Sequence, residues 1–118
     1  MTNSFLWSTD DHNTNLNQFK KKILHKIKDS SYTSLHNWSV NKKSEFWSDI
    51  WDFTSIKGNK KKPIIENEKS FINSVFFKNS KLNFTENAIR RKDENDAIVF
   101  YSEQGFKRRI SWKKLGQN

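Results

Sequence analysis

Residues 39–53 read SVNKKSEFWSDIWDF and place large apolar side chains at helical spacing. Phe46 and Ile50 lie four residues apart, as do Trp47 and Trp51. Side chains four residues apart share one face of a helix. We therefore predict a helix that begins near residue 39 or 41 and ends near residue 53. Its two adjacent apolar ridges need two surfaces to cover them.

Residues 14–28, upstream of this helix, carry the pattern of an amphipathic helix. Lysines alternate with apolar side chains that recur at helical spacing, namely Leu16, Phe19, Ile23, Leu24 and Ile27. The run Asp29-Ser30-Ser31 is predicted to end this helix and to provide the N-cap of a short second helix through Leu35 and Trp38. Residues 1–12 are predicted to be an extended lead-in, with Phe5 and Trp7 as anchors to a neighbouring surface.

The second half of the chain is predicted to be a loop, a helix and a hairpin. Gly58 and the run up to Pro63 interrupt regular structure, and residues 71–77 are apolar but irregular. The run Lys78-Asn79-Ser80 is predicted to cap a helix over residues 82–91. Residues 97–101 and 106–110 have strand propensity and flank the turn at residues 103–105, which predicts a β-hairpin. Ser111 is the predicted N-cap of a last helix through Trp112 and Leu115.

The composition offers little material for a hydrophobic core. Apolar residues make up 33% of the 118 residues, against about 45–50% in a typical globular domain on a count that includes Gly. Five Trp and ten Phe supply most of the apolar surface. We therefore expect one small domain at most, whose aromatic side chains are covered in part by a surface outside this sequence.

The absence of cysteine excludes disulfides and thiolate metal sites. The sequence shows neither a signal peptide nor an apolar run of the length that crosses a membrane. We expect a cytoplasmic protein with no membrane partner.

The net charge of +9 raises nucleic acid as a possible partner class. The charge is spread along the chain, with +5 in residues 1–62 and +4 in residues 63–118. Only four residues are Arg, the side chain best suited to bidentate recognition of phosphate. A solvated basic surface that binds no nucleic acid is therefore the expectation, although aromatic stacking on single strands stays open as an alternative.

No catalytic, cofactor-binding or metal-binding group emerges from the spacing of the polar residues. The three histidines share no metal-ligand spacing, and the three glycines stand too far apart for a phosphate-binding loop; they are His12, His25, His36, Gly58, Gly105 and Gly116. Glu86 suits the first turn of a helix. The cluster Asp93-Glu94-Asp96 suits a polar connection, so neither is expected to carry acid–base chemistry.

The order of several motifs carries more information than any one of them. The motifs are Asn13-Thr14-Asn15-Leu16 with Phe19, Leu35-His36-Asn37-Trp38-Ser39-Val40, Phe46-Trp47, Ile50-Trp51-Asp52-Phe53, Phe76-Phe77, Lys81-Leu82-Asn83-Phe84-Thr85-Glu86-Asn87, Asp96-Ala97-Ile98-Val99-Phe100 and Ile110-Ser111-Trp112-Lys113-Lys114-Leu115. Together they resemble the amino-terminal region of the acetoacetyl-CoA synthetases, within the acyl-adenylate-forming ligase superfamily. Phe76 departs from the Trp usual in that family, and Phe84 and Trp112 stand where Tyr is common.

The resemblance implies an α+β fragment of a longer ligase. Residues 1–92 would be a mostly helical N-terminal cap, and residues 93–118 a β-hairpin that begins the large α/β AMP-binding (adenylation) domain. The family-signature and docking positions would be Trp38, Phe46, Trp47, Trp51, Phe77, Leu82, Asn83 and Asn87.

The resemblance also implies the reaction of the full-length protein. Acetoacetate and ATP would form acetoacetyl-adenylate and pyrophosphate with the help of Mg²⁺, and CoA would then displace AMP. ATP, Mg²⁺ and CoA would bind beyond residue 118, and the partner of this segment would be the remainder of the chain. Three alternatives stay open: another short-chain ligase such as an acetyl- or propionyl-CoA synthetase, a free-standing basic nucleic-acid-binding module, and an interaction domain that shares the cap without the enzyme.

Overall fold

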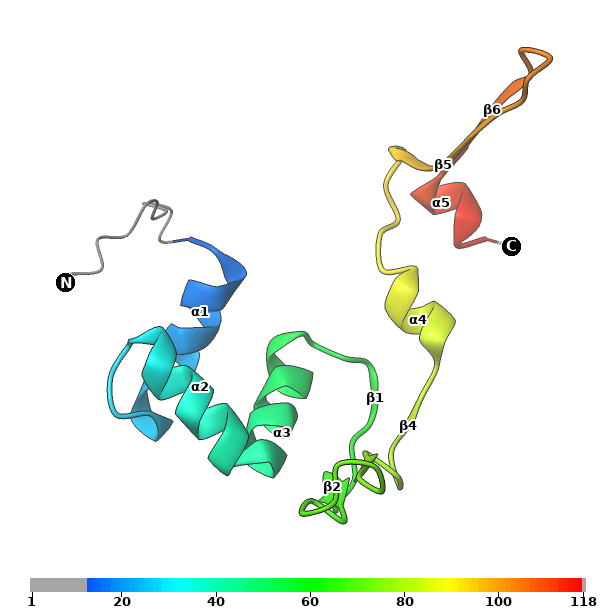
Figure 1. Cartoon of the computed structure of the whole chain (residues 1–118). Coiled ribbons are helices and arrows are strands. Elements are labelled where there is room, and N and C mark those ends of the chain that lie inside the picture. Colours follow the sequence, from blue (N-terminus) through cyan, green and yellow to red (C-terminus); the bar gives the residue numbers. More distant parts are fainter. Residues whose placement is uncertain (1–12, 118) are drawn as a thin grey trace. The chain divides into compact units, whose positions relative to one another are not determined.

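The computed structural model of the chain describes residues 13–117, and these form two compact units. Unit 1 comprises residues up to 55 together with residues 61–79, and unit 2 comprises residues 56–60 and 80–118. Helices and short antiparallel strand pairs occur together, so the predicted α+β class is confirmed (Figure 1). The predicted lead-in with Phe5 and Trp7, and His12, lie outside the described residues.

Unit 1 begins with α1 (Asn15–Lys22), whose N-cap Thr14 accepts a hydrogen bond from the Asn17 amide at 3.3 Å. The predicted continuous helix to residue 28 is wrong in its second half. The backbone leaves the helical region at Ile23, and a 3₁₀ turn, η1 (Leu24–Lys26), follows. This turn lets Ile23 and Ile27 both enter the core, while Leu24 stays half exposed.

The next two helices follow the prediction closely. Ser31 caps α2 (Tyr32–Asn41), because its hydroxyl accepts a hydrogen bond from the Ser34 amide at 3.1 Å. Lys42 leaves helical geometry, so α3 (Lys43–Phe53) begins slightly later than predicted and ends at the predicted residue.

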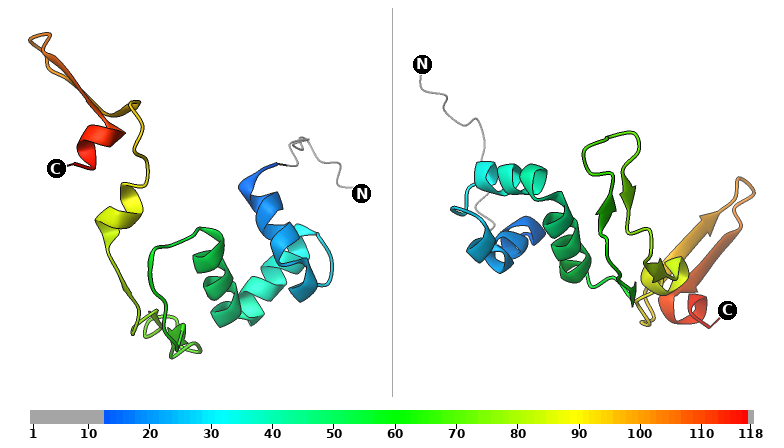
Figure 2. Two further views of the ribbon diagram at one scale, coloured as in Figure 1. Left: turned by 180° about the vertical axis from the view of Figure 1, so that it is seen from behind. Right: turned by 90° about the horizontal axis from the view of Figure 1, so that it is seen from below.

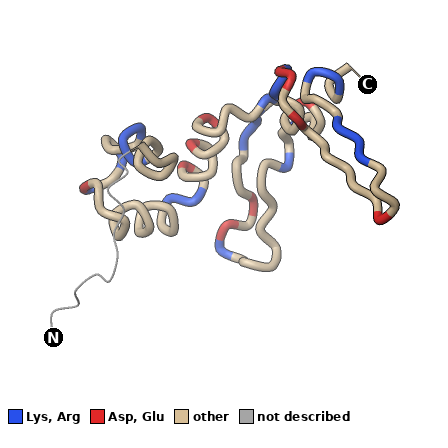
Figure 3. The backbone as a smooth tube through the Cα atoms, turned by 90° about the horizontal axis from the view of Figure 1, so that it is seen from above, with Lys and Arg blue, Asp and Glu red and all other residues tan. Residues whose placement is uncertain are grey.

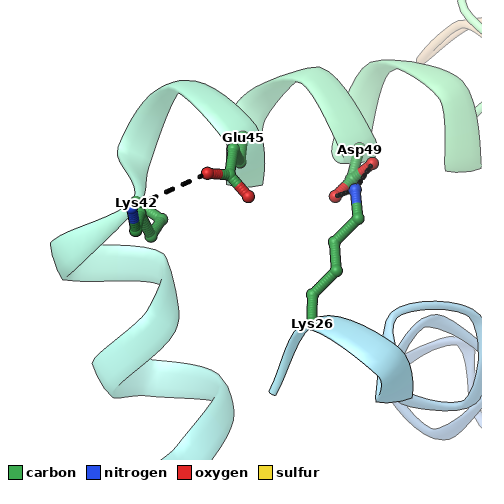
Figure 4. A network of polar contacts seen from close by, with 4 residues as sticks. All are labelled: Lys26, Lys42, Glu45 and Asp49. Atoms are coloured by element: carbon green, nitrogen blue, oxygen red, sulfur yellow. Dashed lines mark hydrogen bonds and ion pairs between the residues drawn. The ribbon is translucent and has the colours of Figure 1, made fainter.

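The core of unit 1 lies among these helices. Its buried members are Phe19, Ile23, Ile27, Leu35 and Trp38, with Phe46, Ile50 and Phe53 packed against them. A salt bridge adds to this packing at the surface, where Lys26 Nζ lies 2.6 and 2.9 Å from the two carboxylate oxygens of Asp49 and joins η1 to α3 (Figure 4).

Two short strands complete unit 1. Ile65–Glu66 (β2) pairs antiparallel with Val75–Phe76 (β3), so the prediction of an irregular segment over residues 71–77 is wrong at its end. Ile64 and Ile65 are buried. The Ile64 carbonyl accepts a hydrogen bond from the Phe77 amide at 2.8 Å, which continues the pairing by one residue.

Unit 2 starts with the pairing of Gly58–Asn59 (β1) with Lys81–Leu82 (β4). A Cβ atom at Gly58 would lie 2.7 Å from the Lys81 carbonyl oxygen, so this close approach requires glycine. Because Leu82 belongs to β4, α4 (Phe84–Ala88) is shorter than the predicted helix over residues 82–91. Its cap is Asn83, not the run at residues 78–80.

The predicted hairpin and last helix are confirmed. Asp96–Tyr101 (β5) pairs antiparallel with Lys107–Ser111 (β6), and Gly105 takes a positive φ of 79° in the turn. Ser111 then caps the single-turn helix α5 (Trp112–Leu115) by accepting from the Lys114 amide. Residues 80–92 group with the hairpin in this chain. The division of the whole ligase at residue 92 stays a prediction.

Candidate functional site

A series of aromatic rings runs through unit 1. Phe19 contacts Phe46 and Phe53, and Phe46 also contacts Trp38 and Trp47, with ring centroids 5.1 to 6.1 Å apart. Edge-to-face contacts at such distances add to the stability that burial of the rings provides. The series therefore joins α1, α2 and α3 into one packed body.

The predicted docking positions of unit 1 divide into buried and exposed side chains. Trp38 is 8% exposed and Trp51 is 5% exposed. Trp51 packs on Phe77 at 4.9 Å, so this ring pair joins α3 to the segment after β3. Trp47, by contrast, is 39% exposed and lies 5.6 Å from the ring of half-exposed Phe76. Of these rings, the Trp47–Phe76 pair is therefore the one that offers apolar surface to another body.

In unit 2, Asn87 holds together two segments that are far apart in sequence. Its side-chain amide donates to the Lys57 carbonyl and accepts from the Lys57 amide, both at 2.8 Å. The same side chain donates to the Asn83 carbonyl at 2.9 Å, and Asn83 caps α4. Both asparagines therefore maintain the fold of unit 2. Nothing in the sequence pattern pointed to Lys57 as the partner of Asn87.

Apolar side chains next to these asparagines face solvent. Leu82 is half exposed, and Phe84, at the first position of α4, is 81% exposed. The sequence marked Phe84 only as part of the motif at residues 81–87. Its position directly after the N-cap, where a side chain points away from the helix body, could have predicted that the Phe84 ring is exposed.

The hairpin has one apolar face. Alternation along β5 and β6 places Ile98, Phe100 and Ile110 on one side, together with Arg108. The opposite side carries Val99, Tyr101, Lys107 and Arg109, and the guanidinium of Arg109 there donates to both Asp96 and the Tyr101 hydroxyl. Each apolar residue of the first face is at least partly exposed. The hairpin therefore offers a second apolar surface.

Positive charge is concentrated in unit 2, although it is even along the sequence. Unit 2 has eleven Lys and Arg and five Asp and Glu, which gives +6 of the total +9. Figure 3 shows the basic residues along β6 and in α5. The prediction of an evenly spread charge therefore holds for the sequence halves but not for the folded units.

The acidic cluster of unit 2 is engaged in ion pairs. Asp93 accepts from the Arg91 guanidinium and Glu94 from the Lys113 ammonium, at 2.8 and 2.6 Å. These hydrogen bonds lower the pKa of Asp93 and the pKa of Glu94 below their ordinary values. A general acid at neutral pH needs a raised pKa, so both carboxylates are poorly suited to that role.

The described residues do not assemble a catalytic centre. Within residues 13–117, no three His, Cys, Asp or Glu side chains are placed to hold a metal ion. His25 and His36 are exposed, and His36 stacks on Tyr32. A cavity of about 440 Å³ lies between α4 and α5, and its polar lining is Thr85, Glu86, Lys92, Lys113 and Gln117.

Among the residues that the structure describes, no helix combines the length and the apolar character needed to cross a bilayer.

Comparison with known proteins identifies relatives by sequence. An acetoacetyl-CoA synthetase from Xenopus tropicalis is 33% identical over 110 residues, covering 89% of this chain and 16% of the relative. The acetoacetyl-CoA synthetase of Danio rerio is 30% identical over 122 residues, covering 99% and 18%. A malonamoyl-CoA synthetase from Penicillium aethiopicum is 28% identical over 93 residues, covering 72% and 13%.

The chain thus spans less than one fifth of the length of these curated relatives. No protein-family model matches the sequence, and no solved structure matches the fold. The resemblance drawn from the ordered motifs is confirmed by the named relatives.

Proposed function

The chain is related in sequence to the acetoacetyl-CoA synthetases, and we propose from this relationship that it is the amino-terminal part of an AMP-forming acetoacetate-CoA ligase. One observation carries the proposal: the similarity extends over nearly the whole chain but over less than one fifth of each relative. The residues that bind nucleotide, metal and thiol then belong to the part of the enzyme outside these 118 residues.

In the full-length enzyme, acetoacetate attacks ATP to give acetoacetyl-adenylate and pyrophosphate, and the CoA thiol then displaces AMP. Mg²⁺ assists the first step by neutralising phosphate charge. This segment itself binds neither ATP, Mg²⁺ nor CoA in our proposal. The enzyme works in the cytoplasm.

The segment serves as a cap that leads into the adenylation domain. Its exposed apolar surfaces, the Trp47–Phe76 pair and the hairpin face with Phe100, support this role. Apolar surfaces of this kind are costly in water and are usually covered by a partner. The hairpin adds a second argument, because two strands alone are marginally stable and gain from joining a larger sheet.

The acyl group is the least constrained part of the proposal. The fungal relative is named for a malonamoyl group, so the names of the relatives do not agree on one acyl group. Another short-chain acid, such as acetate or propionate, is the alternative substrate.

The test is an assay of the full-length protein encoded by the gene from which this chain derives. We expect pyrophosphate to form when ATP and acetoacetate are present and AMP to be released only when CoA is added as well; acetate and propionate are then tested in place of acetoacetate. The 118-residue chain is the matched control and should show no activity. If the full-length protein forms no AMP in response to an added carboxylic acid, the proposal is refuted. A preference for propionate would change only the substrate.

The charge of unit 2 favours one second candidate, a nucleic-acid-binding module. Its net charge of +6 and the exposed rings of Phe100 and Tyr101 suit a single-stranded ligand. Against it, Arg91, Arg109 and Lys113 are already paired with carboxylates. Tight binding of the 118-residue chain to single-stranded DNA or RNA, with a steep dependence on salt, would favour this candidate.

A further inference from the structure

The loop between β2 and β3 ends in two adjacent apolar side chains without cover. We refer to residues 67–74 as the finger; it projects beyond the two strands that it joins (Figure 2). Phe71 is 99% exposed and Ile72 is 91% exposed. Neither residue belongs to the docking positions predicted from the sequence.

Hydrogen bonds within the loop fix the shape of the finger. Asn67 takes a positive φ of 54°, and its carbonyl accepts from the Ser70 amide at 2.8 Å. Its side chain donates to the Asn73 carbonyl at 3.2 Å, and the Ser74 hydroxyl donates to the Ser70 carbonyl at 2.6 Å. A loop ordered in this way loses little conformational entropy when its tip binds a surface.

The base of the finger is attached to the rest of unit 1. Lys78 pairs with Glu66 at 2.8 Å, and Lys43 of α3 donates to the Glu68 carbonyl at 3.4 Å. Trp47 of α3 contacts Phe76 of β3, as described above. The finger is therefore a defined projection from the helical body.

We propose that Phe71 and Ile72 insert into an apolar pocket on the remainder of the ligase chain and so anchor the cap to it. This inference rests on the proposed function and adds a specific contact to it. An aromatic and an aliphatic side chain at the centre of a contact are typical anchors of protein interfaces. The remainder of the ligase is long enough to provide this pocket, because the relatives are more than five times as long as the part they share with this chain.

The charges around the finger favour a protein surface over a membrane or a nucleic acid. The charged residues of the finger and its base are Lys43, Glu66, Glu68, Lys69 and Lys78, so the net charge is only +1. Attachment to anionic lipid requires a cluster of basic residues next to the inserted side chains. Burial in an apolar protein pocket requires no such cluster.

Thiol labelling tests the inference directly. The chain contains no cysteine, so Ile72→Cys introduces the only thiol within these 118 residues. Alkylation of the peptide that contains residue 72 is followed by mass spectrometry in the isolated chain and in the full-length protein. Lys21→Cys, on the exposed lysine-rich side of α1, is the matched control. Each rate in the full-length protein is divided by its rate in the isolated chain, which removes differences in local thiol reactivity.

We expect the rate at residue 72 to fall about tenfold or more in the full-length protein, and the rate at residue 21 to stay within about twofold. An equal rate at residue 72 in a full-length protein with ligase activity would overturn the inference and leave the proposed function intact. Absence of ligase activity is a separate result that refutes the proposed function.

Two other binding partners of the finger, a second copy of the chain and a lipid surface, would each give a distinct experimental result. Protection of residue 72 in the isolated chain that grows with its concentration would show that a second copy covers the finger, and would overturn the inference. Binding of the isolated chain to phosphatidylserine vesicles, lost in the double variant Phe71→Ser/Ile72→Ser, would overturn it in favour of a lipid surface.

The same double variant separates docking from folding. Both side chains are exposed in the isolated chain, so its circular dichroism should not change. In the full-length protein we expect a lower melting temperature than in a Lys21→Ser control, because the pocket loses its occupant. An unchanged melting temperature would contradict the inference.

Discussion

Asn87 acts as a substitute for a strand partner. A side-chain amide places N–H donors next to a carbonyl acceptor, and Asn87 uses one of each on the backbone of Lys57. The motif at residues 81–87 drew attention to this asparagine in the sequence. Its partner lies 30 residues away and could not be predicted, because no local pattern marks the backbone of Lys57.

Replacement of Asn87 should loosen unit 2. Asn87→Ala removes two hydrogen bonds to Lys57, each worth about 0.5–1.5 kcal/mol of net stability. We expect the Lys57 amide to exchange its hydrogen about tenfold faster, measured by NMR. Asn41→Ala is the control, because the Asn41 side chain bonds only within its own helix, to the Asn37 carbonyl. Unchanged exchange at Lys57 would show that the strand pairing of Gly58 is enough to protect the Lys57 amide.

The pairing of Glu94 with Lys113 predicts a pH response. The Lys113 ammonium lowers the pKa of Glu94. The stabilisation that this ion pair provides is therefore fully present at pH values above the ordinary pKa of a glutamate, and it is lost as the pH falls through the lowered pKa. Lys113→Met should raise the pKa of Glu94 towards its ordinary value, as followed by NMR titration of its carboxyl carbon. Lys114→Met should leave it unchanged, and an equal effect of both variants would point to general screening.

Helix caps were the most predictable elements of this chain. Ser31 and Ser111 cap α2 and α5 as predicted, because Ser at an N-cap satisfies an amide that the helix leaves unpaired. The cap of α4 was misplaced. Two runs with N-cap chemistry follow each other there, and the tertiary pairing of Leu82 with Gly58 decides between them.

Other elements left too little signal for prediction. The strands β1 to β4 have two residues each and show no alternation. The end of α1 at Lys22 falls within a continuous apolar pattern, and the burial of both Ile23 and Ile27 overrides that pattern. The hairpin was predictable because β-branched and aromatic residues flank a turn with Gly105.

Loss of a cap should weaken α2 and, through it, the core of unit 1. Ser31→Ala removes the hydrogen bond to the Ser34 amide and should cost about 1 kcal/mol. The measurement is hydrogen exchange of the α2 amides by NMR, which reports local opening without requiring a cooperative melt. Ser30→Ala, at the exposed neighbouring residue, should change stability by less than about 0.5 kcal/mol. Equal effects of the two variants would refute the capping role.

At the scale of the whole molecule, the sequence indicated that aromatic side chains would carry most of the packing, but the buried side chains of the described residues are Ile23, Ile27, Leu35, Ile64 and Ile65 as well as Phe19, Trp38 and Trp51. It did not separate the rings that the chain buries itself, such as Trp38 and Trp51, from those that it leaves exposed, such as Phe71 and Phe84. Helical spacing places rings on a face but does not show which other segment covers that face. The pairing of β2 with β3, which is followed by the Phe77 ring on Trp51 and leaves Phe71 exposed, depends on contacts between distant residues.

The isolated 118-residue chain should be helical but loosely packed. Its exposed apolar residues include the Trp47–Phe76 pair, the hairpin face and the finger. We expect it to bind a hydrophobic dye and to unfold over a broad temperature range, since little apolar surface is buried cooperatively. The full-length protein should bind less dye per molecule and melt sharply. A sharp melt of the isolated chain as a monomer without dye uptake would show that it is a complete domain.

The interleaving of the two units sets an order for folding during synthesis. Residues 56–60 leave the ribosome before residues 61–79, yet they pair with Leu82 and Asn87, which follow. All residues of unit 1 have been synthesised once residue 79 has left the ribosome. Residues 56–60, in contrast, have no pairing partner until α4 has been synthesised. A pause in translation between these points would therefore leave a folded helical body joined to an unpaired strand. In that interval the unpaired strand would be open to chaperones and proteases.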